Sequence, residues 1–286
     1  MDNSPPAARV LLAVDLSYQS YRASAAHPML TSGRHFTGGL YGFFQTMAKA
    51  IRETKANRII ICKDTKPYLR SAEYPEYKML RKGNANEELL KMHKASMRLI
   101  EEVLVTIGAP IWSLPGFESD DLIGHLVRVR RHRYQSIYAA SNDSDLFQLF
   151  DARNFFVYSK DIESLWHRER LWSEFGVTPD EYLTMTALTG THNDIAGIHK
   201  VGPKTAVKAI KDPSLMRTYM EKHGDLISRN KRLIHLPHRE FPRHPRIPGA
   251  AAAYDSRVLY RALGRYDIDV TATISRSFEQ VLTYDR

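Results

Sequence analysis

Residues 136–145, SIYAASNDSD, hold the pattern that decides the fold: a short apolar run is followed at once by two acids. The same pattern occurs twice more, as VLLAVD at residues 10–15 and as IIICKD at residues 59–64. Short apolar or β-branched runs without polar alternation are typical of strands buried on both faces, as in a parallel sheet. We therefore expect three parallel strands, each ending in acid.

Helical patterns lie between these strands. Apolar residues recur at helical spacing over residues 40–51, 87–107 and 120–130. Such alternation of strands and helices predicts an α/β fold over residues 1–165, with a mostly parallel central sheet flanked by helices.

Beyond Trp166 the strand signal fades, and residues 166–286 are expected to form a second, helical region. Thr178 and Pro179 fit the capping residue and first helical position of one helix. Two further helices are expected over residues 203–211 and 214–223.

Residues 235–249, HLPHREFPRHPRIPG, are expected to form an extended basic loop. Its histidines match no common structural zinc spacing and have no cysteine beside them. A last helix and a short strand are expected within residues 256–270.

Composition excludes several classes of protein. The 286 residues are 43% hydrophobic and 26% charged, so the chain can bury a full core and is not disordered. A single cysteine, Cys62, excludes a disulfide scaffold, and no apolar run is long enough for a membrane span or a signal peptide. We expect a soluble, cytoplasmic protein whose net charge of +9 permits a polyanionic partner.

Acids gather where ligands usually bind. In open α/β sheets this is the crevice beyond the carboxyl ends of the strands. The acids expected there are Asp15, Asp64, Glu118, Asp120, Asp121, Asp143 and Asp145. Any one of them could be a helix cap or a solvated turn residue, most simply Asp120. Together they would repel one another unless hard cations such as Mg²⁺ or Mn²⁺ bound, which suggests metal-assisted phosphodiester hydrolysis with two ions about 4 Å apart.

Basic residues follow the second strand. Lys78 and Arg81 are three positions apart, so on a helix they would share a face and reach one phosphate; Arg70 precedes them. The alternative is an ordinary solvated basic face.

Five segments, in this order, resemble the 5′ nuclease superfamily of flap endonucleases and 5′–3′ exonucleases, most closely its phage and bacterial branch. The segments are VDLSYQSYR (14–22), ICKD (61–64), PGFESDDLIGHLV (115–127), SNDSDLFQLF (141–150) and GIHKVGPKTA (197–206).

The resemblance implies roles for the acids and bases. Asp15, Asp64, Glu118 and Asp120 would form a first metal site with Asp121 behind them, and Asp143 and Asp145 the core of a second. Lys78 and Arg81 would steer and polarise the scissile phosphate, with Arg70 at a further basic position of the motif.

The resemblance also implies DNA contacts. Tyr21 would stack on the base next to the cleaved bond, although it could instead be a core aromatic. Residues 82–106 would form an arch over the free 5′ end. Arch side chains placed to contact phosphates include Lys82, Lys91, His93, Lys94 and Arg98.

Residues 190–211 resemble the helix–hairpin–helix element that grips duplex DNA. Its hairpin N–H groups and following helix N-terminus would bind a phosphate or a bridging K⁺ ion. The residues concerned are Gly197, Lys200, Gly202, Lys204, Thr205 and Lys208. Lys200 stands where the family usually has the first hairpin glycine, which puts the ion site in question.

A second departure lies at residues 190–195, GTHNDI, where the family has G-D-x-x-D-N. Aligned from Gly190, Thr191 replaces the first acid and Asp194 keeps the second. Aligned backward from Gly197, Asn193 takes the place of the second acid. Either way at most one acid survives, so we expect a weak second metal site that needs high Mg²⁺ or favours Mn²⁺.

The expected activity is that of a Mg²⁺-dependent 5′–3′ exonuclease or flap endonuclease, using two metal ions and leaving 5′-phosphates. Its substrates would be DNA with a free 5′ end, flap or nick, and RNA–DNA hybrids by resemblance. The chain would act as a monomer, in the host cytoplasm if phage-encoded. The alternatives are a structure-specific DNA-binding protein with weakened catalysis and a PIN-type endoribonuclease.

Overall fold

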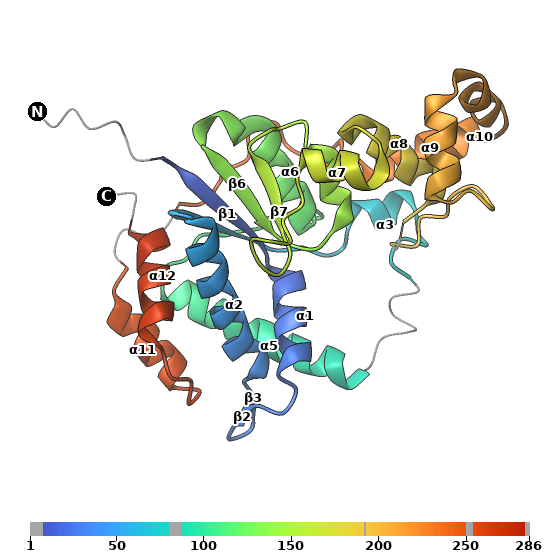
Figure 1. The fold of residues 1–286 in the computed structure, drawn as a ribbon. Coiled ribbons are helices and arrows are strands. Elements are labelled where there is room, and N and C mark those ends of the chain that lie inside the picture. Colours follow the sequence, from blue (N-terminus) through green and yellow to red (C-terminus); the bar gives the residue numbers. More distant parts are fainter. Residues whose placement is uncertain (1–7, 80–86, 192, 250–253, 284–286) are drawn as a thin grey trace, which may run out of the picture.

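A five-stranded, wholly parallel sheet forms the centre of the molecule. The computed structural model describes residues 8–79, 87–191, 193–249 and 254–283. The strand order is β5-β4-β1-β6-β7, with β1 in the middle (Figure 1). The strands are β1 (Val10–Asp15), β4 (Arg58–Cys62), β5 (Ile111–Trp112), β6 (Ser136–Ala140) and β7 (Phe155–Tyr158). The three predicted strands are therefore confirmed as the central three, while the sequence pattern did not indicate β5 and β7.

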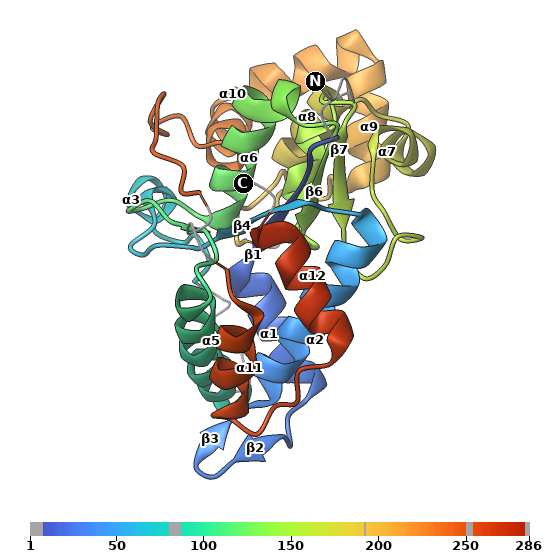
Figure 2. The same ribbon diagram turned by 90° about the vertical axis from the view of Figure 1, so that its left-hand side faces the viewer.

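One face of the sheet packs against helices from both ends of the chain (Figure 2). Leu12 and Val14 of β1 point into this core. The helices are α1 (Leu16–Ala26), α2 (Gly38–Thr54), α5 (Glu87–Thr106), α11 (Ser256–Gly264) and α12 (Ala272–Leu282). A small antiparallel hairpin, β2 (Thr31–Ser32) with β3 (His35–Phe36), lies between α1 and α2 in the chain.

The opposite face takes the alternate residues of the same strand, Leu11 and Ala13. Since neighbouring residues of β1 enter different cores, the strand is apolar throughout, as its sequence predicted. The elements on this side are α3 (Leu69–Glu73), α6 (Ser119–Arg130), η1 (Arg131–Arg133), η2 (Ser144–Leu149), α7 (Arg168–Phe175), α8 (Pro179–Thr189), α9 (Pro203–Lys211) and α10 (Pro213–Ile234).

The helical second half follows the sequence with two corrections. Thr178 caps α8 in a capping box with Glu181, as expected from the TPDE sequence. Helix α10 runs on to Ile234, and the helix end predicted at 223 falls at a kink, where His223 has non-helical φ and ψ between two helical segments. The short strand expected within residues 256–270 is wrong for the described residues, where α11 is followed by α12.

Helix α5 covers most of the segment expected to form an arch. From Ser96 onward one side of the helix is buried, with Ile100 and Leu104 in the core beside α1 and α2. The arch over residues 82–106 stays a prediction. Residues 80–86, with Arg81 and Lys82, lie outside the described residues.

No described helix has the length and apolar character needed to cross a membrane. Cys62, the last residue of β4, is completely buried and is a free thiol.

Candidate active site

The acids predicted at the strand ends do lie along one edge of the sheet. Asp15 is the last residue of β1, Asp64 follows β4, and Asp143 and Asp145 follow β6. Because β4 and β6 both pair in parallel with β1, these three ends are neighbours. Glu118 joins them from the start of α6.

Local hydrogen bonds fix the first of these carboxylates. Asp15 caps α1 by accepting from the backbone N–H of Tyr18 at 3.1 Å, and its other oxygen accepts from the Ser141 hydroxyl at 3.0 Å. Asp64 accepts from the backbone N–H of Ser119 at 2.7 Å. The ends of β1, β4 and β6 and the start of α6 are thus tied together by polar contacts.

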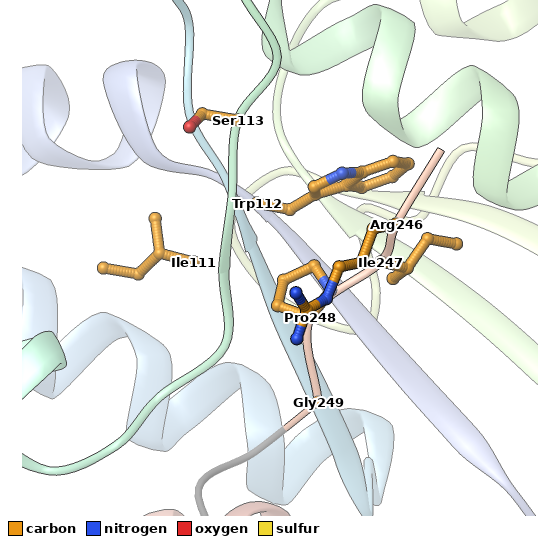
Figure 3. A pocket seen from close by; sticks show the side chains of 7 residues that line it. All are labelled: Ile111, Trp112, Ser113, Arg246, Ile247, Pro248 and Gly249. Carbon is orange, nitrogen blue, oxygen red and sulfur yellow. The ribbon is translucent and has the colours of Figure 1, made fainter. Parts of the chain in front are cut away.

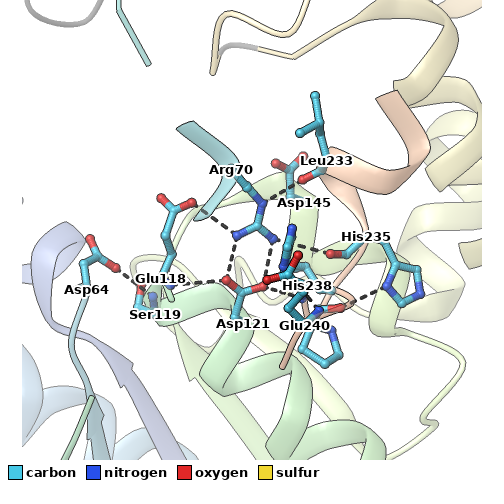
Figure 4. A network of polar contacts seen from close by, with 12 residues as sticks. Asp64, Arg70, Glu118, Ser119, Asp121, Asp145, Leu233, His235, His238 and Glu240 are labelled. Atoms are coloured by element: carbon cyan, nitrogen blue, oxygen red, sulfur yellow. Dashed lines mark hydrogen bonds and ion pairs between the residues drawn. The ribbon is translucent and has the colours of Figure 1, made fainter. Parts of the chain in front are cut away.

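Arg70 is the centre of a buried polar network (Figure 4). It makes a bidentate pair with Asp121, at 2.6 and 2.8 Å, and also reaches Glu118 at 3.2 Å. Its remaining bonds go to the carbonyls of Leu233 at 2.7 Å and His235 at 3.4 Å. All five N–H groups of the guanidinium are engaged inside the protein. Arg70 is 3% exposed, so it positions the acids and has no donor left for a phosphate.

Glu118 collects donors from three side chains. Besides Arg70 it accepts from the Tyr77 hydroxyl at 2.8 Å and from the ammonium of Lys78. Lys78 lies in a turn with φ of 57°, so the helix on which it would share a face with Arg81 is absent at this residue. Its side chain is nevertheless held at the acids, 19% exposed.

The carboxylates fall into two electrostatic groups. Burial, together with the charge of Asp64, raises the pKa of Asp15 to about 7. Burial, together with Asp143, raises the pKa of Asp145 to about 8. Burial and Asp121 likewise raise the pKa of Asp120. By contrast, although burial opposes it, Arg70 lowers the pKa of Asp121.

The donor chemistry of this edge fits a hard divalent cation. Carboxylate oxygens are the ligands that Mg²⁺ and Mn²⁺ prefer, and one oxygen of Asp120 is buried with no hydrogen-bond partner among the described residues. Within those same residues, no three or more acid, histidine or cysteine side chains are already gathered into a metal-binding cluster. The acids therefore lie close together at the ends of their strands, and burial is the main cause of the raised pKa values of Asp15, Asp120 and Asp145.

The ambiguous stretch 190–195 brings Asn193 to the acids. Asn193 is buried, and its side-chain nitrogen lies 3.5 Å from an oxygen of Asp145. Its own amide oxygen has no partner among the described residues, and its backbone carbonyl accepts from the N–H of Lys78 at 3.1 Å. Asp194 follows with φ of 64°, and Thr191 accepts from the N–H of Asn193. The contact with Asp145 agrees with the alignment that places Asn193 where the family has an acid.

Tyr21 stands on α1 beside α5. It is 43% exposed, which removes the core-aromatic interpretation, and its ring meets His93 edge-on at 5.6 Å. Ser20 fixes the same histidine through a 2.9 Å contact to Nε2. Lys91 and Lys94 are exposed on the same half of α5. An exposed ring and two free ammonium groups therefore lie together at the start of this helix.

The predicted hairpin lies between α8 and α9 (Figure 1). Lys200 has φ of 64°, so it keeps the left-handed turn that glycine favours. Gly202 caps α9, with Pro203 as its first residue, and Lys204, Thr205 and Lys208 are exposed. Gly197 has a different function: an added Cβ would lie 2.2 Å from the backbone of Thr189, so this glycine permits close chain packing.

Three residues of this region were missed by reasoning from sequence: Tyr77, Ser141 and His238. The backbone N–H of His238 donates to Asp121 at 2.7 Å, from the loop after α10. Tyr77 lies within the basic segment and Ser141 opens SNDSD, so proximity to the motifs could have indicated those two. Nothing local could have indicated His238.

Comparison with known proteins agrees with this geometry. The profile of the family described as "5'-3' exonuclease, N-terminal resolvase-like domain" matches residues 10–176. The 5'-3' exonuclease of Aquifex aeolicus is 30% identical over 206 residues, 71% of this chain and 69% of that protein. DNA polymerase I of Mycobacterium tuberculosis is 28% identical over 241 residues, 80% of this chain but 26% of the polymerase. The bacteriophage T5 flap endonuclease, solved with DNA and metal ions, superposes with a TM-score of 0.67 at 19% identity, covering 80% of this chain and 90% of that one.

A parallel sheet with buried acids at its carboxyl edge defines the class as an α/β protein that shares the fold of the T5 enzyme. The family profile covers more than half of the 286 residues, and the Aquifex relative is 30% identical over most of its length. The chain belongs to the 5′–3′ exonuclease family of 5′ nucleases.

Proposed function

We propose that this chain is a Mg²⁺-dependent 5′–3′ exonuclease and flap endonuclease that hydrolyses DNA from a free 5′ end. The observation that carries the proposal is the row of buried acids with unmatched charge, Asp15, Asp120 and Asp145, in a protein of net charge +9. Burial and neighbouring carboxylates raise their pKa values, and divalent cations would supply positive charge that favours the ionised forms.

The carboxylates divide into two sets of candidate ligands. Asp15, Asp64, Glu118 and Asp120 would hold one cation, and Asp143 and Asp145 a second. When bound, such cations activate water and neutralise charge on the phosphate. Asp121 acts indirectly, because its pairing with Arg70 holds the start of α6 and so aims Glu118.

Lys78 supplies a positive charge beside these acids. Burial opposes its charge, but Glu118 raises the pKa of the ammonium, so Lys78 stays protonated at neutral pH. The ammonium also lies 5.3 Å from the centre of the Tyr68 ring and 5.2 Å from that of Tyr77. It is therefore placed to orient a phosphate between the acids and the exposed start of α5, and Arg81 would assist it.

DNA would be held at two places. Near the acids, Tyr21 offers a stacking surface for a base, and Lys91 and Lys94 offer charges to the strand. At the hairpin, the cap of α9 with Lys204 and Lys208 would grip duplex phosphates. The left-handed Lys200 supports a conserved hairpin shape and, with it, a K⁺ site.

Asn193 favours one alternative, a DNA-binding protein of weakened catalysis. A neutral amide beside Asp145 removes one negative charge from the second set of ligands. The other acids persist, so we propose a second cation that binds weakly. A PIN-type endoribonuclease has less support, since the hairpin before α9 and the exposed Lys91 and Lys94 of α5 are both present.

The test uses a labelled flap, a nicked duplex, an RNA–DNA hybrid and single-stranded RNA, each with Mg²⁺ or EDTA. Asp145→Asn should lower flap cleavage about 10²–10³-fold, the scale observed when one preorganised electrostatic group is removed. DNA binding in EDTA, measured by fluorescence anisotropy, should not weaken. Binding with no Mg²⁺-dependent cleavage by the wild type would establish the weakened protein instead, and cleavage of single-stranded RNA alone would establish the endoribonuclease.

A further inference from the structure

Gln148 is a buried side chain to which the proposed mechanism gives no role. It lies in η2, the short helix that is capped by Asp143 and contains Asp145, and it is 4% exposed. Its side-chain nitrogen donates to the carbonyl of Asp145 at 2.8 Å and to that of Ile234 at 3.0 Å. Its side-chain oxygen accepts from the N–H of Leu236 at 2.9 Å. Both N–H groups and the oxygen of this amide therefore have partners inside the protein.

These bonds join two segments that are far apart in the sequence. Ile234 is the last residue of α10 and lies 86 positions from Gln148, and Leu236 lies 88 positions away in the loop that follows the helix. The last carbonyls of an α-helix have no partner within the helix, so side chains that reach them hold the helix end in place. Gln148 therefore joins η2, with its two acids, to the end of α10.

The neighbouring carbonyls of α10 hold the other acids. Arg70 donates to the carbonyl of Leu233 at 2.7 Å and to that of His235 at 3.4 Å (Figure 4). The same guanidinium pairs with Asp121 at the start of α6. Three consecutive carbonyls, those of residues 233–235, thus accept from Arg70 and Gln148. Both sets of candidate ligands are therefore tied to one support, the end of α10.

The loop after α10 is itself held in place. The carbonyl of Leu236 accepts from the Nε of Arg128 in α6 at 2.7 Å. Phe241 is buried, and its ring lies 4.8 Å from that of Phe117. Farther along, residues 246–249 line a hollow together with the residues of β5 (Figure 3). The anchor that Gln148 uses is therefore fixed by α6 and by the packing of the loop.

Asp145 needs such an anchor because its carboxylate lies beside another one. Its N–H donates to Asp143 at 2.9 Å and its carbonyl accepts from Gln148, so side chains take both of its main-chain groups. The side-chain nitrogen of Asn193, at 3.5 Å, is a distant partner for the carboxylate itself. Two carboxylates at one site repel each other, so the backbone of Asp145 must be held for both to face one cation.

We propose that Gln148 is a positioning residue for the second cation. By tying Asp145 to the end of α10, it keeps Asp143 and Asp145 in the arrangement that binds the metal. The inference rests on the proposed function, because it requires a cation at this pair of acids. A glutamine with a purely structural role would change the stability of the protein but not the affinity for the cation.

The test measures Mn²⁺ binding by electron paramagnetic resonance, so it needs no cleavage. Gln148→Met keeps the length of the side chain without its polar atoms. It should weaken the second Mn²⁺ about 10–100-fold, the range for groups that support metal ligands, and leave the first unchanged. The matched control is Asn154→Leu. The amide nitrogen of Asn154 also donates to two carbonyls, of Arg131 and Tyr134, but it lies just before β7, at the opposite edge of the sheet from the acids. This control should bind both Mn²⁺ ions as the wild type does.

A milder variant covers the case in which Gln148→Met fails to fold, since that change leaves buried carbonyls unpaired. Gln148→Asn keeps an amide but is one methylene shorter, so it should weaken the second Mn²⁺ by a smaller factor. Exchange of the Leu236 amide hydrogen in EDTA reports whether the bridge is broken, independently of any metal. Faster exchange together with unchanged Mn²⁺ binding would overturn the proposal.

Two further results separate this inference from the proposed function. Equal weakening of both Mn²⁺ ions in Gln148→Met would mean a general loss of structure at the acids and would overturn the positioning role alone. A wild type that binds no Mn²⁺ would overturn the proposed function, and with it the second cation that Gln148 is proposed to serve.

Discussion

Asp121 and Asp145 are both buried acids at the same edge of the sheet, yet their ionisation is opposite. Asp121 is paired twice with Arg70 and has a lowered pKa, whereas Asp145 faces Asp143 and an amide and has a pKa raised to about 8. The charge of Asp121 is neutralised by Arg70, whereas Asp145 has no such ion pair among the described residues. The difference separates acids that hold the architecture from acids that await a cation.

Removing Arg70 should destabilise the protein by breaking its ion pairs with Asp121 and Glu118. Arg70→Met leaves Asp121 buried without its charged partner and takes one of three side-chain donors from Glu118, so the free energy of unfolding should fall by about 3–5 kcal/mol. Urea denaturation measures it. Arg131→Met removes an exposed pair with Asp151 and should cost about 1 kcal/mol or less. Equal small losses would mean that Arg70 does not brace the acids.

The same substitution at the two acids should have opposite effects on the metal-free protein at pH 9. Asp121→Asn loses charge-assisted bonds to Arg70 and should destabilise by about 1.5–3 kcal/mol. Asp145→Asn removes a disfavoured buried charge and should raise the melting temperature. Calorimetric melting in EDTA checks both. If both variants are destabilised alike, the comparison between the two acids fails.

Asn193→Asp should strengthen cation binding at the second set of ligands, Asp143 and Asp145. A carboxylate beside Asp145 adds a negative charge to the second set of ligands. The more weakly bound of the two Mn²⁺ ions should therefore bind about tenfold more tightly. Mn²⁺ binding followed by electron paramagnetic resonance measures it without any cleavage. Asp194→Asn is the matched control and should leave Mn²⁺ binding unchanged. Loss of the second Mn²⁺ in that control would show that Asp194 is the ligand.

The smallest effect is expected in the pH dependence of stability. Since the folded protein keeps protons on Asp15 and Asp145 up to about pH 7 and 8, it binds more protons than the unfolded chain above pH 4. Stability without metal should therefore fall by about 1.4 kcal/mol as the pH rises from 7 to 8, and Mg²⁺ should restore it more at pH 8 than at pH 7. We expect a few °C, at about 2–4 °C per kcal/mol. A Mg²⁺ effect that is larger at pH 6 would contradict the assignment.

Sequence predicted the parts of this molecule that are local in the chain. The ends of β1, β4 and β6 could be predicted because each apolar run is followed by its acid. The edge strands could not, since β5 has two residues and its pattern is too short to read. The helix end predicted at 223 falls at the kink of α10, while the second helical segment, with Ile227 and Leu233 buried, continues to Ile234.

The hydrogen bonds and ion pairs that position the acids could not be predicted from sequence patterns. Arg70 was expected only at a further basic position of the motif, whereas its bond to the carbonyl of Leu233 joins residues 163 positions apart. No spacing rule links such residues, because the end of α10 lies beside α3 only in the folded chain. The choice between Asn193 and Asp194 was open for a simpler reason: two alignments differ by one residue, and only the contact with Asp145 distinguishes them.

The lone thiol gives the chain a built-in probe. Cys62 is buried at the end of β4, and burial with the nearby Asp15 and Asp64 raises its pKa, so a thiol reagent meets neither an accessible nor an ionised group in the folded protein. A fluorophore attached to a cysteine introduced at exposed Val105 would thus label one position alone. In the unmodified chain, the slow rate at which a thiol reagent modifies Cys62 would report how often the central sheet opens.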